Sequence, residues 1–163
     1  MKKGLMRLGE ILVKKGMITE AQLHDALLSQ KLTSGFLGTI LVGKGVIGQR
    51  QIVEALSEQF DIPLIDLKTQ YVDMELSRKF SSSLIVDHKC FPLRADDMSV
   101  TVAITNPLNA VALSKVEEEA GSKKINWVLA GEDDMKELIQ KYRQNISLNI
   151  QRMLKKGNVN NNQ

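Results

Sequence analysis

The sequence is poor in several features, and each shortage excludes a class of protein. It has one cysteine, Cys90, so no internal disulfide can form and a reducing compartment is expected. No apolar run approaches the roughly 18 residues that a membrane span requires. The basic start, residues 1–16, is interrupted by charges within its apolar part, and no small-residue cleavage site follows it. We therefore predict a cytoplasmic protein without a transmembrane segment or an export signal.

Acidic residues are absent from residues 141–163, which carry five basic side chains. Residues 61–140 have the opposite balance, with a net charge of −5, and residues 1–60 carry +3. The overall charge of +3 is too small to predict DNA binding. The uneven distribution fits either solvated helix faces or an anionic partner near one end of the chain.

A phosphate-binding loop is only half present in this sequence. Residues 38–45 read GTILVGKG, which matches G-x-x-x-x-G-K but ends in Gly45 instead of the serine or threonine that holds magnesium. The inner four residues are mostly large and apolar. This favours a helix that ends at Gly45 over a nucleotide hydrolase, although the hydrolase stays a third alternative.

An internal duplication occupies the first part of the chain. Residues 7–30 align with residues 36–59, half of the aligned positions are identical, and the five residues KLTSG separate the copies. In the first copy Lys14 stands where the second has Gly43. The phosphate-loop pattern is therefore not what the copies share.

Each copy has the pattern of a helical hairpin. Apolar residues recur at helical spacing before Gly16 and Gly45, and glycine is favoured where a helix ends in the left-handed conformation. Thr19 and Gln22 form a capping-box pattern for the second helix, and Gly48 takes the cap position in the other copy. Because neither hairpin can bury its apolar face alone, we expect the two to pack together.

Two pairs of equivalent residues are not explained by the packing of apolar helix faces. Gly9 and Gly38 lie near helix starts, where glycine is unfavourable for helix stability. They could permit tight helix packing or offer backbone amides to an anion. Gln30 and Gln59 end the copies, and they could cap the surface or bind a ligand.

The repeated pattern R-L-G-x-x-L-x-x-x-G-x-x-x-x-x-x-L-x-x-x-L-x-x-Q resembles the N-terminal (MshEN) domains of type IV pilus and type II secretion ATPases. The resemblance continues over residues 62–142, through Pro63, Pro92 and Pro107, and so covers nearly all of the chain. It implies a cyclic di-GMP site built from both copies. The implied ligand-binding residues are Arg7, Leu8, Gly9, Leu12, Leu23, Leu27, Gln30, Leu37, Gly38, Leu41, Ile52, Leu56 and Gln59.

The chemistry of the ligand agrees with these residue types. Cyclic di-GMP has two phosphates and two guanines, so a site needs cationic or amide donors, polar groups for the base edges and apolar surface beneath the bases. Arg7 can pair with phosphate or stack on a base. Phe36 stands where the family more often has a basic residue or proline, so the second copy lacks one electrostatic contact.

Residues 61–142 predict a small α/β part. Strands are expected at 63–66, 90–94, 98–104 and 125–129, with a hairpin turn at 95–97. Helices are expected at 73–80, 82–87, from Pro107 to Ala120 and over 132–142, arranged on one side of a three-stranded layer. The fold class is thus α+β: helical hairpins (1–60) on a three-stranded α/β part (61–142), then a basic tail (143–163). The tail continues the last helix or docks on a partner or membrane, and disorder is predicted from Gly157.

No catalytic constellation is apparent in the sequence. His24 and His88 share no metal-ligand spacing, and Asp96 and Asp97 are predicted to form a turn. No complete ATPase core is present either. The sequence therefore predicts a non-catalytic regulatory domain without a cofactor, whose ligand is cyclic di-GMP. The alternative is a docking module that contacts the inner-membrane assembly platform of a pilus or secretion system without binding nucleotide. A platform protein or an ATPase of such a system is the expected protein partner.

Overall fold

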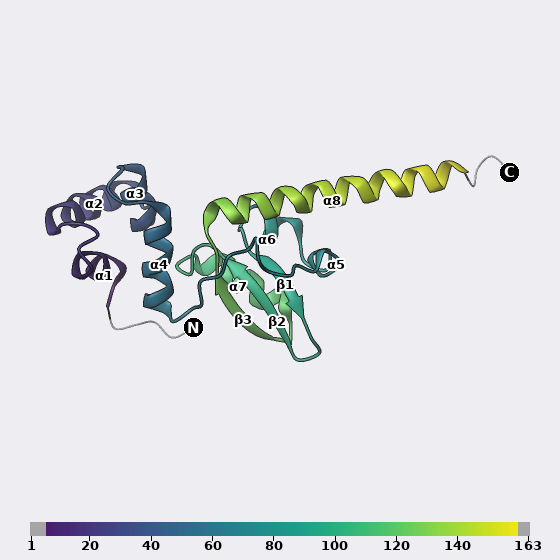
Figure 1. The fold of residues 1–163 in the computed structure, drawn as a ribbon, viewed down its shortest axis with the longest axis horizontal. Helices are drawn as coiled ribbons and strands as arrows, with labels where there is room; N and C mark the ends of the chain where they lie inside the picture. The colour runs from purple at the N-terminus through teal and green to yellow at the C-terminus, as the bar shows by residue number, and fades with distance from the viewer. Residues whose placement is uncertain (1–5, 160–163) are drawn as a thin grey trace.

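The fold consists of four short N-terminal helices, a three-stranded sheet with its own helices, and a long C-terminal helix (Figure 1). The structure, a computed structural model, describes residues 6–159. Its elements are α1 (Leu8–Lys14), α2 (Glu20–Thr33), α3 (Leu37–Gly43), α4 (Gln49–Phe60), α5 (Met74–Ser77), α6 (Ser82–Val86), β1 (Phe91–Ala95), β2 (Ser99–Ile104), α7 (Ala110–Ala120), β3 (Lys124–Leu129) and α8 (Glu132–Val159). The predicted α+β class is confirmed. Within residues 6–159 no helix has both the length and the apolar character needed to cross a membrane.

The two predicted hairpins are present, and their ends repeat in detail. Gly16 and Gly45 have φ values of +67° and +68°, in the left-handed region that glycine enters without a Cβ clash. After each glycine the next amide bonds back into the helix, from Met17 to Leu12 at 2.9 Å and from Val46 to Leu41 at 3.0 Å. The predicted capping box of α2 is confirmed as well.

The sheet has the order β1-β2-β3. β1 and β2 are antiparallel, and β2 and β3 are parallel, joined by α7 as a crossover. The predicted hairpin turn is confirmed, because the Asp96 carboxylate accepts bonds from the amides of Met98 (2.8 Å) and Ser99 (2.7 Å). These amides stabilise the charged form and lower the pKa of Asp96.

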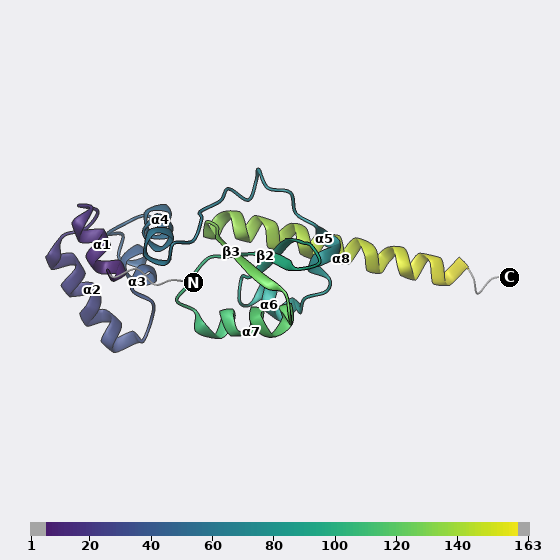
Figure 2. The ribbon, with the colours of Figure 1, turned by 90° about the horizontal axis from the view of Figure 1, so that it is seen from below.

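Helices cover both faces of this sheet, so the prediction that they lie on one side is wrong. Val100 and Val102 of β2 belong to the core cluster that includes α7, whereas Ala103, on the opposite face, belongs to the cluster that includes α8. Figure 2 shows α7 and α8 on opposite sides of the strands. Side chains alternate along a strand, and β2 is buried along nearly its whole length.

Two predicted elements of the α/β part need correction. Residues 63–66 form no strand, because only Leu64 makes a bridge, to Leu129 of β3. Pro63 has no N–H to donate, which limits further pairing. The helix predicted from Pro107 begins at Ala110 with Asn109 as its cap, while Asn106 instead holds a preceding turn.

The last helix extends far past its predicted end at Tyr142. α8 continues to Val159, so the alternative in which the tail prolongs the last helix is confirmed, and the proposed boundary at residue 143 falls inside it. The prediction of disorder from Gly157 is wrong for residues 157–159, and residues 160–163 lie outside the described residues.

Candidate functional site

The four N-terminal helices bring the two copies together in a crossed arrangement. α1 packs on α4, and α2 packs on α3, so the first helix of each copy contacts the second helix of the other. These two contacts are equivalent under the duplication. The residues predicted to bind ligand therefore gather in one helical group, at one end of the molecule (Figure 1).

The two glycines of the pattern lie at close contacts between the two helices of their own hairpins. A Cβ added to Gly9 would lie 2.5 Å from Leu23 Cδ1, and one added to Gly38 would lie 2.7 Å from Ile52 Cγ2. Leu23 and Ile52 are equivalent positions of the two copies. Both glycines are buried and permit a close approach of two helices, the first of the two roles that the sequence left open.

Most of the predicted apolar residues are core residues of the free protein. Leu12 and Leu41 are fully buried, and Leu8, Ile52 and Leu56 are at most 5% exposed. Leu23 and Leu37 are half-buried, whereas Leu27 is 40% exposed. Among these apolar positions Leu27 offers the most surface to a ligand.

Arg7 caps the start of α1, and its side chain is exposed. Its backbone N–H donates to Glu10 Oε2 at 2.8 Å, which fixes the entry of the chain into the helix. The exposed guanidinium has room to meet an anion from solvent. The equivalent position in the second copy is Phe36, which caps α3.

The two glutamines have different surroundings. Gln30 is half-buried, and its Nε2 donates to the carbonyl oxygen of Gly35 at 2.9 Å. Gln59 is 3% exposed, and its Oε1 has no hydrogen-bond partner among the described residues. A buried acceptor without a partner destabilises the free protein and is satisfied by any ligand that donates to it.

A small cleft lies where the second copy meets the α/β part. It has a volume of about 30 Å³ and includes four predicted residues, Leu8, Gly38, Ile52 and Leu56. Its other walls come from Phe36, Thr39, Gln49, Thr105, Asn106, Leu108 and Glu132. Sequence reasoning missed the residues of the 105–108 loop, because no local pattern indicates which loop will face the helices.

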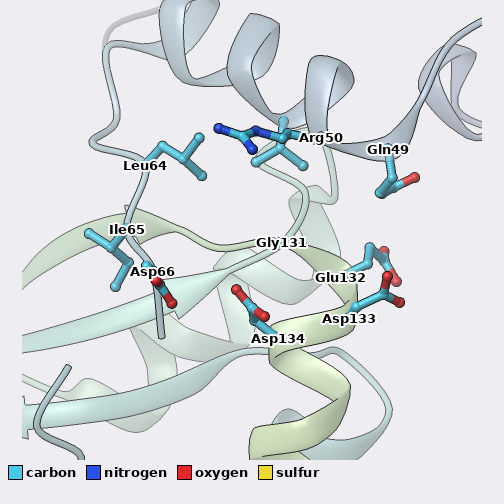
Figure 3. Close-up of a pocket in the computed structure, with 10 residues that line it drawn as sticks. Gln49, Arg50, Leu64, Ile65, Asp66, Gly131, Glu132, Asp133 and Asp134 are labelled. Carbon is cyan, nitrogen blue, oxygen red and sulfur yellow. The ribbon is translucent and has the colours of Figure 1, made fainter. Parts of the chain in front are cut away.

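A larger cleft of about 400 Å³ separates α4 from the start of α8 (Figure 3). Its floor and far wall carry the carboxylates of Asp66, Glu132, Asp133 and Asp134. Arg50 lies across from them, but its guanidinium pairs with Glu54 at 3.0 Å. None of the predicted ligand-binding residues lines this cleft, and its carboxylates would repel a phosphate.

Among the described residues, histidine, cysteine and acidic side chains form no cluster that could hold a metal ion. His24 is exposed on α2, and His88 is half-buried in the loop after α6. Burial raises the pKa of the Cys90 thiol to about 12, which keeps it protonated near neutral pH. Cys90 therefore behaves as a small core residue.

The chain is similar in sequence to ATPases that assemble type IV pili. The type IV pilus assembly ATPase PilB of Myxococcus xanthus is 30% identical over 136 residues, which are 83% of this chain and 24% of that protein. PilB of Thermus thermophilus is 29% identical over 120 residues, covering 72% and 14%. The chain thus spans about a quarter or less of the length of these relatives.

Two solved structures share the fold. A structure of MshE with cdg has a TM-score of 0.76 and 26% identity, and the match covers 84% of this chain and 99% of that one. The N-terminal domain of XpsE has a TM-score of 0.69 at 17% identity, over 86% and 96% of the two chains, and supports the fold alone.

The family match falls on a different part of the chain from the duplication. The MshEN domain model matches residues 60–147, from the end of α4 into α8. The fold match to MshE covers 84% of this chain and so includes part of the duplicated helices as well. Because the family model matches more than half of the sequence, the chain belongs to the MshEN domain family.

Proposed function

We propose that this chain is a non-catalytic regulatory domain that binds cyclic di-GMP and acts with type IV pilus or type II secretion machinery. The fold match to MshE with cdg, which we take to be cyclic di-GMP, carries the proposal, because it covers 99% of that chain. The two copies of the ligand pattern in this sequence support it independently. A two-fold ligand suits two equivalent hairpins that cross-pack.

The exposed members of the pattern would make the first contacts. Arg7 would pair with a phosphate through charge-assisted hydrogen bonds, and Leu27 would lie against a base. Oε1 of Gln59, which has no partner among residues 6–159, would accept a bond from the edge of a guanine once the helices admit it. The buried leucines would then serve mainly to hold the two hairpins in register.

Titration calorimetry of the whole chain with cyclic di-GMP tests the proposal, with GTP and ATP as competing nucleotides. We expect binding of cyclic di-GMP alone at micromolar concentrations, weakened about tenfold or more in Arg7→Ala. Arg50→Ala is the matched control, because Arg50 is an exposed arginine outside the predicted site.

Absence of heat with cyclic di-GMP up to about 100 μM would contradict the proposal. Equal loss in Arg7→Ala and Arg50→Ala would show that the effect is general electrostatic attraction. Binding that survives Arg7→Ala unchanged would move the phosphate contact to another residue.

The second candidate function, docking on a pilus or secretion platform protein, is favoured by the outer surface of α2. Leu28 is 48% exposed and Leu32 is 87% exposed, four residues apart on one side of the helix. Exposed leucines at this spacing suit a protein contact. A chain that gives no heat with any nucleotide but binds such a partner, and loses it in Leu32→Ser, would establish this function.

A further inference from the structure

The second half of α8 projects beyond the rest of the described chain (Figures 1 and 2). Its last contacts with the α/β part are made by Asn145, which accepts a bond from Arg78 Nη2 at 3.1 Å, and by Ile146, which packs against the core. From residue 147 to residue 156 every residue is exposed except Asn149, which is half-buried. Isolated helical turns are marginally stable in water, so a projecting segment of this length gains from a partner.

An apolar stripe continues from the core along this segment. Ile150 and Met153 follow Ile146 by four and seven residues, which places all three on nearly the same side of the helix. Ile150 is 53% exposed and Met153 is 70% exposed, and Leu154, 65% exposed, borders them. The helical spacing of apolar residues that packs α8 against the sheet therefore continues into the part of α8 that projects beyond the sheet.

The charges around this stripe are of one sign. Arg143 and Lys156 flank the stripe, while Arg152 and Lys155 lie on the side of Leu148; all four are exposed, and none forms an ion pair among the described residues. No acidic residue follows Glu137 in the chain. A partner that fits is therefore apolar along one line and acidic beside it.

The position of the stripe on α8 limits which kinds of partner can contact it. Ile146 packs toward the α/β part, so that part lies on the same side of α8 as the start of the stripe and stands in the way of a flat surface there. A second copy of this helix would bring two strongly basic segments together. A single rod that lies alongside α8, with its end near α5, satisfies both conditions.

We propose that residues 147–156 of α8 bind an acidic amphipathic helix of a partner protein along the stripe of Ile150 and Met153. The two helices pack in a helix-to-helix contact of the knobs-into-holes kind, with Lys156, and Arg143 one turn before the stripe, beside the acids of the partner. The interaction is independent of cyclic di-GMP binding, because none of the predicted ligand residues lies on α8.

Fluorescence anisotropy with a labelled synthetic peptide tests the proposal on the whole chain. The probe has about three heptads with leucine at positions a and d and glutamate at e and g, and a lysine-for-glutamate peptide is its control. We expect the acidic peptide alone to bind, more weakly as NaCl rises from about 50 to 300 mM. The double variant Ile150→Ser with Met153→Ser should weaken binding about tenfold or more, as should Arg143→Glu with Lys156→Glu.

Leu148→Ser is the matched control, because Leu148 is 54% exposed, like Ile150, but lies on the opposite side of the helix. It should change the affinity by less than about twofold. Circular dichroism checks that every variant keeps its helix. The proposal fails if the acidic peptide does not bind, or if Leu148→Ser weakens binding as much as the stripe variant. It is also overturned if the stripe variant abolishes a dimer in sedimentation or binding to phosphatidylglycerol vesicles, which would make a second copy or a lipid surface the occupant.

Discussion

The two copies of the duplicated hairpin have nearly the same sequence pattern but different positions in the molecule. In copy one, α2 lies on the outside, and Ala26 is its one buried residue. In copy two, α4 buries six residues, among them Ile52, Leu56 and Gln59. α4 is the helix of the group that lies nearest the sheet (Figure 1). The same pattern therefore forms a solvent-exposed helix in one copy and a core element in the other.

The residues that differ between the copies follow from this difference in position. Arg7 faces solvent at the start of α1, while Phe36 lines the clefts against the α/β part together with Thr105 and Asn106. The cleft at position 36 also holds Lys89, which pairs with Glu132 at 2.6 Å. Phe36 adds apolar area to the wall of this cleft.

The largest expected effect compares Leu56 with Leu27, the equivalent leucines of the two copies. Leu56 is 4% exposed, so Leu56→Ala should lower the free energy of unfolding by about 2–5 kcal/mol. Leu27 is 40% exposed, so Leu27→Ala should lower it by less than about 1 kcal/mol. Urea unfolding measures both. Equal losses would show that the two copies are equally important to the core, against the burial described above.

A smaller effect is expected at the glycines. Gly38→Ala places its Cβ against Cγ2 of Ile52, a β-branched and buried side chain that cannot turn away, so a loss of about 1–3 kcal/mol is expected from overpacking. Gly9→Ala meets the Cδ1 end of Leu23, which is half-buried and can change rotamer. The gain in helix propensity, about 1 kcal/mol, then makes Gly9→Ala nearly neutral.

A double variant decides whether the clash is the cause. Ile52→Ala removes the Cγ2 atom, so Gly38→Ala should be less harmful in that background than in the natural chain. Additive losses would assign the effect of Gly38→Ala to the backbone and not to the contact with Ile52.

Local signals predicted the hairpins well. Gly16 and Gly45 mark helix ends, Thr19 and Gln22 mark a helix start, and each acts through atoms within a few residues of itself. Because the pattern occurs twice, each helix end and helix start was indicated by two copies of the sequence. The family match to residues 60–147 lies entirely beyond the repeat that suggested it, so the two parts of the chain support the assignment separately.

Long-range placement could not be predicted in the same way. Nothing in the pattern of α2 and α4 says which of them will face the sheet, because their apolar positions coincide. The 105–108 loop begins the crossover connection between β2 and β3, and this connection places it at the small cleft. No local sequence pattern predicts that placement. Residues 63–66 have the composition of a strand, but their pairing partner supports only one bridge. The roles of the ligand-binding residues stay predictions.

The smallest expected change in stability is at the two glutamines, where the two substitutions should have opposite signs. Gln30→Met removes a bond of 2.9 Å to Gly35 and should destabilise the chain by about 1 kcal/mol. Gln59→Met replaces a buried amide whose Oε1 has no partner among the described residues, so it should stabilise the free chain by about 1 kcal/mol. If Gln59 also contacts cyclic di-GMP, the more stable variant should bind it more weakly, as measured by calorimetry beside urea unfolding. A Gln59→Met chain that is less stable than the natural one would instead show that this amide is already satisfied in the free protein. In that case Gln59 would be a structural residue of copy two, and the polar contacts to the ligand would have to come from copy one.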